Sequence, residues 1–92
     1  MSQIQVSLLT QLKAAAECSH FDIPCDTAMP LSSVLAFTVE RYKELRPLIF
    51  NDDDTAHGWL MISVNDAIVA RGSDPEVQPG SSVLVGTPIS GG

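Results

Sequence analysis

The end of the chain is the part of the sequence best suited to carry chemistry, because it closes on Ser90-Gly91-Gly92. Glycine has no Cβ, so such an end can pass through a channel too narrow for other residues, with unrestricted φ. The α-carboxylate of Gly92 is unhindered and can be presented to a nucleotide bound by another protein. Background glycine usage of about 7% gives a terminal Gly-Gly pair by chance in roughly 0.5% of chains, and a cloning scar would look the same. The position of the pair, at the end of a short tail, favours a substrate that reacts through its own terminus.

The side chains offer few rival centres of chemistry. Cys18 and Cys25 are too far apart for a Cys-x-x-Cys pair, and His20 and His57 complete no zinc set at ligand spacing. We expect both thiols to be reduced, with a disulfide as the alternative, and Cys18 to be the thiol more open to oxidation. The aspartates at positions 52–54 lack the glycine and later glutamate of a calcium loop, which indicates a solvated loop. We therefore expect no metal and no permanently bound cofactor.

Length and charge narrow the class of protein. The 92 residues are enough for one domain with a modest core. A hydrophobic content of 45% with 17% charged residues is typical of a globular chain rather than a disordered one. The net charge of −6 argues against a nucleic-acid partner, which requires a basic face. It favours partners with a basic docking surface.

No segment of the sequence has the length and apolarity of a membrane span. The apolar start is interrupted by polar residues, and no positively charged region precedes it, so we expect no signal peptide. The expected location is the cytoplasm, with no membrane partner.

Alternating apolar residues predict five strands. Ile4, Val6 and Leu8 share one face of the first strand. The other predicted strands cover residues 20–25, 60–64 and 67–69 and a last segment around Val83 and Val85. Pro24 lacks the N–H that a sheet ladder uses, which predicts that its strand lies at an edge. Trp59 is expected to pack at the edge of a strand.

A change to helical periodicity predicts one main helix over residues 31–45. Pro30 suits its first turn, and Arg46-Pro47 should end it. A second, short helical turn is expected over the alanine-rich residues 12–18. The order of elements predicts an α+β fold, a mixed sheet of about five strands with the first and last strands central and one main helix packed across it. We expect a domain over residues 1–86 and an extended tail over residues 87–92.

Three apolar residues fall on the sheet face that alternation turns away from the helix, namely Leu9, Ile68 and Leu84. A sheet covered on one face should be polar on the other, so these residues are candidates for an exposed docking surface. The alternative is that they are scattered surface residues of no consequence.

With these elements and this ending, the sequence resembles the ubiquitin-like β-grasp sulfur carriers of the MoaD/ThiS family, most of all the type that forms the small subunit of molybdopterin synthase. The segments that carry the resemblance are Ile4-Gln5-Val6-Ser7-Leu8-Leu9, Val64-Asn65-Asp66-Ala67-Ile68-Val69, Pro79-Gly80-Ser81-Ser82-Val83 and Pro88-Ile89-Ser90-Gly91-Gly92. Residues 11–19 fill a place that the shorter thiamine-type carriers lack. The sequence departs from the family at Gly86, where the family often has an outward-facing aromatic residue.

The resemblance implies that Gly92 is the reacting residue and Gly91 its unhindered neighbour. An E1-like adenylating enzyme would use ATP to activate Gly92, and a sulfurtransferase or cysteine desulfurase would supply the sulfur of a thiocarboxylate. The large catalytic subunit of molybdopterin synthase would then direct that sulfur onto a pterin precursor. The tail segment expected to contact the partner, together with Leu9, Ile68 and Leu84, comprises Gly86, Thr87, Pro88, Ile89 and Ser90. Pro88 would stiffen the tail, and Ile89 could anchor in an apolar notch.

Other functions remain open at this point. The sulfur could serve thiamine thiazole, cysteine or tRNA thiolation, or Gly92 could form isopeptide bonds with lysines of target proteins. A binding module with an incidental Gly-Gly ending is a third possibility. None of these requires the chain itself to be a catalyst.

Overall fold

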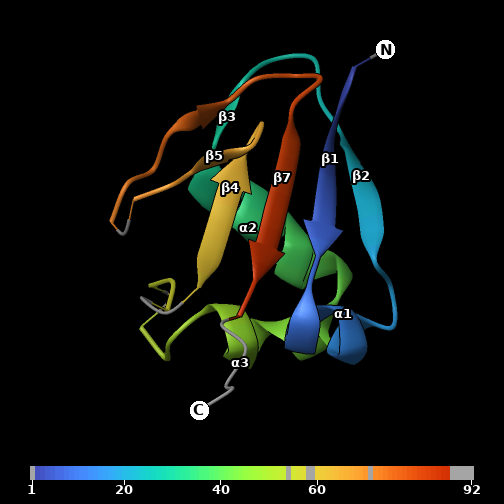
Figure 1. The fold of residues 1–92 in the computed structure, drawn as a ribbon, viewed down its shortest axis with the longest axis vertical. Coiled ribbons are helices and arrows are strands. Elements are labelled where there is room, and N and C mark those ends of the chain that lie inside the picture. Colours follow the sequence, from blue (N-terminus) through green and yellow to red (C-terminus); the bar gives the residue numbers. More distant parts are fainter. Residues whose placement is uncertain (1, 54, 58–59, 71, 88–92) are drawn as a thin grey trace.

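The computed structural model describes residues 2–53, 55–57, 60–70 and 72–87. Five strands form the main sheet in the order β2-β1-β7-β4-β5 (Figure 1). Their bounds are β1 Gln3–Leu8, β2 His20–Pro24, β4 Met61–Val64, β5 Ala67–Ile68 and β7 Ser82–Gly86. β1 and β7 pair in parallel, and the other pairs of this sheet are antiparallel. The predicted mixed sheet with the first and last strands together at its centre is confirmed.

Strand β2 lies at an edge of this sheet, as Pro24 predicted. Backbone bonds close both ends of its pairing with β1, since Leu8 N donates to Ser19 O and Cys25 N donates to Ser2 O. Pro24 sits between these positions and faces the open edge, where its missing N–H removes a donor that another strand would need.

A second sheet of two short strands was not predicted. β3 (Met29–Pro30) pairs antiparallel with β6 (Glu76–Val77). Two-residue strands are too short to show an alternating pattern, so the sequence gives no signal for them. Pro30, expected in the first helical turn, is instead the extended residue that precedes the helix, with φ −67° and ψ 153°.

The predicted helix over residues 31–45 is confirmed as far as Arg41 and is wrong in its last four residues. The helix α2 spans Leu31–Arg41, a 3₁₀ turn η1 spans Lys43–Leu45, and α3 spans Arg46–Ile49. The chain leaves the helical region at Tyr42, where φ is −124° and ψ is 86°, and the Tyr42 ring packs edge-on against Phe21 at 5.2 Å between centroids. Pro47 does not end a helix here, because it lies in the first turn of α3, where its missing N–H is not needed.

The predicted short helical turn is present as α1, Thr10–Ala16, which begins two residues earlier than expected. It ends at Glu17, whose φ of 54° is the left-handed conformation common at helix ends. The helix lies below the end of β1 (Figure 1) and buries Leu12.

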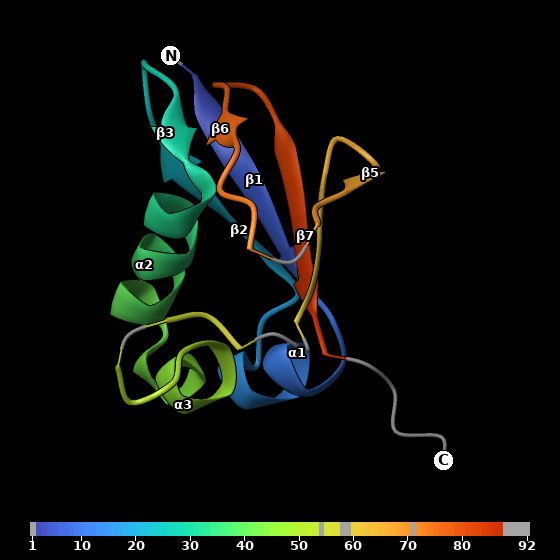
Figure 2. The ribbon, with the colours of Figure 1, turned by 90° about the vertical axis from the view of Figure 1, so that its left-hand side faces the viewer.

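The core lies between the sheet and α2, which crosses one face of it (Figure 2). The sheet contributes the residues that alternation turned inward, which are Ile4, Val6, Leu8, Val83 and Val85. α2 contributes Leu31, Val34, Leu35, Thr38 and Val39. Burying one such aliphatic side chain stabilises the fold by about 1.5–3 kcal/mol relative to exposing it. No helix among the described residues covers the opposite face of the sheet (Figure 2).

Candidate functional site

The last described residue, Thr87, is held by the residue that begins α1. Thr87 is only 6% exposed. Its backbone N donates to Thr10 Oγ1 at 3.0 Å, and the two hydroxyl oxygens are 2.7 Å apart. Thr10 Oγ1 also lies 2.7 Å from the carbonyl oxygen of Leu9 and 3.2 Å from that of Thr87. We call this arrangement the threonine clasp. It ties the end of β7 to the connection that follows β1.

Thr10 forms the clasp from an unfavourable backbone conformation. Its φ is 54°, in the left-handed region that a β-branched residue rarely enters. Such a residue costs about 1–3 kcal/mol and persists only where its surroundings impose it. Here the surroundings include the bond from Leu9 N to Val85 O at 3.0 Å, which fixes the chain immediately before Thr10. The strained residue, Thr10, is therefore the one that is bonded to Thr87, where the C-terminal segment begins.

An apolar patch lies on the uncovered face of the sheet, beside the clasp. The pairing registers align Ser7, Leu84, Ser63 and Ile68 in one row across β1, β7, β4 and β5. The next row toward the clasp pairs Gly86 with Met61, and Leu9 covers Gly86. The apolar members of the two rows are Leu9, Met61, Ile68 and Leu84. The patch thus reaches the strand end from which residues 88–92 continue.

The sequence predicted three members of this patch and missed one. Ile68 is 81% exposed and Leu9 is 45% exposed, and Leu84 is half-buried between its neighbours. Met61, 57% exposed, was not predicted. Alternation could have found it, because Leu60, Ile62 and Val64 face inward and the residue between the first two must face outward.

Gly86 lies directly beneath the Leu9 side chain. A Cβ added at position 86 would come within 3.0 Å of the Cβ of Leu9 and 3.6 Å of its Cδ1. Leu9 thus occupies the space over residue 86, the position at which the sequence departs from the aromatic residue that the resembling family often has. The predicted partner-binding residues Pro88, Ile89 and Ser90, and the predicted reacting residues Gly91 and Gly92, lie outside the described residues.

The other groups that could carry chemistry are engaged locally. Cys18 and Cys25 are both free thiols. The Cys18 thiol donates to the His20 carbonyl at 3.0 Å and accepts from the Tyr42 hydroxyl at 3.3 Å. The ring of His57 bonds through Nε2 to the carbonyl oxygen of Pro47 at 3.0 Å. These contacts tie loops and turns together and bring no two of these groups into a common site.

The acidic loop is a hydrogen-bonded turn. Asp53 accepts from the Thr55 hydroxyl at 2.6 Å and from the Thr55 backbone N at 3.2 Å. The hydroxyl bond, and then the backbone bond, hold the pKa of this exposed carboxyl below its ordinary value of 3.8. Within the described ranges, no three His, Cys, Asp or Glu side chains gather as a metal site would require.

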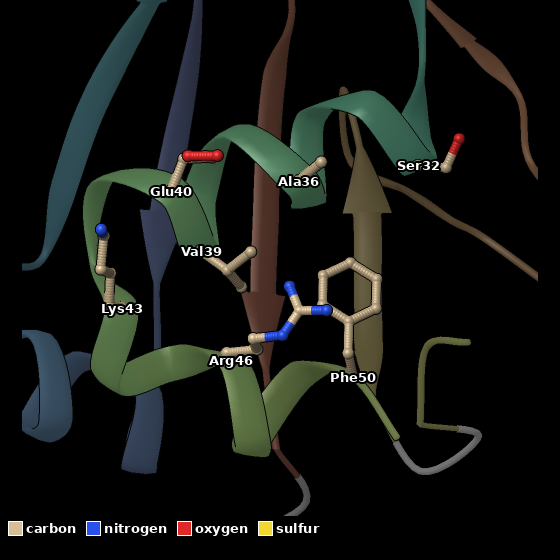
Figure 3. Close-up of a pocket in the computed structure, with 7 residues that line it drawn as sticks. All are labelled: Ser32, Ala36, Val39, Glu40, Lys43, Arg46 and Phe50. Carbon is tan, nitrogen blue, oxygen red and sulfur yellow. The ribbon is translucent and has the colours of Figure 1, made fainter. Parts of the chain in front are cut away.

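A cavity of about 500 Å³ opens on the helix side of the molecule (Figure 3). It lies between α2, η1 and α3, with the Arg46 guanidinium over the Phe50 ring at 5.8 Å from its centroid. Ser32 at its rim is bound to Asp74, through the Ser32 N at 2.7 Å and the Ser32 hydroxyl at 2.8 Å. The cavity shares no lining residue with the apolar patch or the threonine clasp.

No helix in the described part of the chain is both long and apolar enough to cross a membrane.

A mixed five-stranded sheet gripping one helix, with the C-terminal strand at its centre, defines a ubiquitin-like β-grasp protein. The sequence matches the ThiS family over residues 6–92, and the chain belongs to that family. The chain is thus a member of the class of ubiquitin-like sulfur carriers and modifiers. A comparison with curated protein sequences finds no match.

Solved structures share this fold at low sequence identity. SAMP1 from Haloferax volcanii superposes with a TM-score of 0.85 at 20% identity, covering 98% of this chain and 99% of that one. Urm1 from Trypanosoma brucei gives 0.75 at 16% identity, over 99% and 96%. A putative molybdopterin converting factor subunit 1 from Pyrococcus furiosus gives 0.71 at 16% identity, over 97% and 100%. At these identities the similarity establishes the fold.

Proposed function

We propose that this chain is a sulfur carrier, thiocarboxylated at Gly92, that serves as the small subunit of molybdopterin synthase. The observation that supports this most is the extent of the family match, which runs through Gly92. The strand that leads to this glycine is the central β7, and it ends between the threonine clasp and the apolar patch. A carrier needs this combination, because a partner must hold the domain while it handles the terminus.

Activation requires an E1-like adenylating enzyme and ATP, because a carboxylate is a poor acyl donor. An oxygen of the Gly92 carboxylate attacks the α-phosphorus of ATP, an acyl adenylate forms and pyrophosphate leaves. The terminal sulfur of a persulfide, held by a sulfurtransferase or cysteine desulfurase, attacks the acyl carbon and AMP leaves. A thiolate then attacks the donor's sulfur in the resulting acyl disulfide. The S–S electron pair remains on the acyl-bound sulfur as a thiocarboxylate, and the donor and the thiol end as a disulfide.

The side chains indicate which groups the chain contributes to the reaction and which its partner enzymes contribute. None is assigned an acid, base or nucleophilic role, so the activating enzyme and the large catalytic subunit supply those groups. The chain contributes the reacting terminus and the docking surface formed by Leu9, Met61, Ile68 and Leu84. Burial of these side chains against a partner would add roughly 25 cal/mol for each Å² of apolar surface removed from water. The proposal places the reaction in the cytoplasm.

Intact-mass analysis of the protein co-expressed with its activating enzyme tests the proposal. We expect the mature chain to end at Gly92 and a fraction of it to gain the mass difference between oxygen and sulfur. A variant lacking Gly92, or carrying one residue beyond it, should fold normally and never gain that mass. A wild-type chain that stays unmodified with each activating enzyme of its source would overturn the proposal.

A protein modifier is the second candidate, and a specific similarity supports it. The structures of SAMP1 and Urm1 superpose with higher TM-scores than that of the putative molybdopterin converting factor subunit. SAMP1 is named a small archaeal modifier protein. The two functions share the activation step and differ afterwards. Lysine-linked adducts of Gly92 that survive a reducing agent would favour the modifier, whereas recovery of molybdopterin synthesis by the purified thiocarboxylate would favour the sulfur carrier.

A further inference from the structure

We propose that Thr10 is a positioning residue for the C-terminal segment, because the threonine clasp fixes the point from which residues 88–92 are presented to the activating enzyme. This inference rests on the proposed function, because its kinetic test measures the activation of the chain by the adenylating enzyme. It assigns a role to a residue that lies 77 positions from Thr87 in the sequence.

The Thr10 hydroxyl uses its full bonding capacity in the clasp. A threonine hydroxyl has one proton to donate and two lone pairs that accept. Thr10 Oγ1 accepts from Thr87 N at 3.0 Å and lies 2.7 Å from Thr87 Oγ1. When the Thr87 hydroxyl donates to it, the Thr10 proton is left for the Leu9 carbonyl oxygen at 2.7 Å. One side chain thus links Thr87 to the backbone that enters α1.

The backbone of Thr10 indicates that the hydroxyl matters at this position. At φ 54° glycine would be relaxed, whereas threonine is strained. Starting α1 does not require a strained residue, because glycine at position 10 would adopt the same backbone conformation without strain. What threonine adds and glycine lacks is the hydroxyl, and its partners among the described residues lie at Leu9 and Thr87.

Fixing Thr87 in advance means that the enzyme does not have to order this residue on binding. β7 ends at Gly86, so without the clasp no strand pairing would hold Thr87. Ordering the backbone of one further residue at the time of binding corresponds to a factor of about 5–30 in an equilibrium constant. The clasp therefore favours productive binding of the terminus and leaves the chemistry of the bound carboxylate unchanged.

The test is steady-state kinetics of ATP–pyrophosphate exchange by the activating enzyme at varied concentrations of the full-length chain. Thr10→Val keeps the shape of the side chain and removes the hydroxyl, so we expect KM for the carrier to rise about 5–30-fold with kcat within about twofold. Thr10→Ser restores the hydroxyl and should return KM to within about threefold of the wild-type value, as expected if the hydroxyl alone is responsible. Thr55→Val serves as a matched control, because the Thr55 hydroxyl bonds to Asn51 and Asp53 of its own loop, away from the clasp.

Thr10→Gly separates positioning from stability. This variant removes the strain together with the hydroxyl, so it should be folded at least as well as Thr10→Val and still show the raised KM. Hydrogen exchange of the Thr87 amide gives a readout that needs no activating enzyme, and we expect faster exchange in both Thr10→Val and Thr10→Gly. Faster exchange with a wild-type KM would overturn the positioning role. Unchanged Thr87 exchange would overturn the clasp itself, and a wild-type chain that is never adenylated would overturn the proposed function instead.

Discussion

Leu9 lies over Gly86 so closely that a single added methyl group would come within 3.0 Å of the Leu9 Cβ. Leu9 leads from β1 into α1, and Gly86 ends β7, so the contact lies where the two central strands end. It places a large apolar side chain beside the start of the C-terminal segment. The absence of a side chain at position 86 is what allows Leu9 to lie there.

We predict that Gly86→Ala lowers the free energy of unfolding by about 1 kcal/mol. The new Cβ would meet another Cβ, which cannot rotate away, so the ends of β1 and β7 must separate, and overpacking of this kind costs about 1–3 kcal/mol. The lower entropy of the unfolded chain returns about 0.4–1 kcal/mol of this. Equilibrium denaturation in urea measures the difference.

A double-mutant cycle provides the control for this steric argument. In a Leu9→Gly background the opposing Cβ is gone, so Gly86→Ala should be neutral or slightly stabilising. Ser82→Ala, at an exposed position of the same strand, should change stability by less than about 0.5 kcal/mol. An equal loss in both backgrounds would show that the contact with Leu9 is not the cause.

The apolar patch predicts that a substitution within it weakens partner binding and leaves the stability of the fold almost unchanged. Ile68 is 81% exposed, so Ile68→Ala should alter the unfolding free energy by less than about 0.5 kcal/mol. If Ile68 docks against the large catalytic subunit, its truncation should weaken binding by more than about 1 kcal/mol, which is at least a fivefold rise in Kd. Isothermal titration calorimetry with that subunit measures both the affinity and the heat of the association.

Phe37 gives the matched control for the patch. It is also a large exposed side chain, at 50% exposure, but it belongs to α2 on the other side of the sheet. Phe37→Ala should leave Kd unchanged. A loss of affinity as large as that of Ile68→Ala would mean that the sheet face is not the specific docking surface.

The sheet could be predicted from the sequence because its pattern is local and repeated. Ile4, Val6 and Leu8 alternate with polar residues, and this pattern alone assigns the inner face of β1. The same rule predicted that Leu9 and Ile68 face outward, and the structure shows both exposed. The same rule also turns Met61 outward, because this residue lies between the inward-facing Leu60 and Ile62.

The end of α2 and the threonine clasp could not be predicted, because they depend on contacts between residues far apart in the sequence. At the end of α2, the Tyr42 ring contacts Phe21, which lies 21 positions earlier in strand β2. The clasp joins Thr10 to Thr87 through a backbone conformation that threonine disfavours, so propensity argues against it. Both features are decided by tertiary packing, which overrides local preference.

The acidic loop predicts a measurable titration. The Thr55 bonds hold the pKa of Asp53 below 3.8, so its carboxyl should titrate below this value in the folded protein. A depressed carboxyl pKa contributes stability that is present above about pH 4 and is lost as the pH falls through the folded pKa. NMR detection of the Asp53 side-chain carboxyl across pH 2–6 measures the midpoint.

Thr55→Val tests the cause of this shift. It removes the hydroxyl donor, the larger cause, and keeps the backbone donor, so the midpoint should rise toward 3.8 without fully reaching it. A midpoint that does not move would assign the shift to some other group.

The turn between β4 and β5 predicts opposite effects from two neighbouring glycine substitutions. Asn65 and Asp66 both have positive φ, at 51° and 71°, a pair of values that favours Asn-Gly in tight hairpins. Asn65 also bonds through its side chain, accepting from Ser82 N at 2.9 Å and donating to Ser81 Oγ at 3.2 Å. No side-chain bond of Asp66 is present in the described part of the chain.

We therefore expect Asp66→Gly to raise the free energy of unfolding by about 0.5 kcal/mol, since it relieves the backbone and removes no bond. Asn65→Gly relieves the same strain but loses two hydrogen bonds worth about 0.5–1.5 kcal/mol each, so it should lower stability by about 1 kcal/mol. Thermal and urea unfolding of the two variants measure both changes against the wild type. Two changes of the same sign would show that the Asn65 bonds to β7 do not hold the hairpin against the central strand.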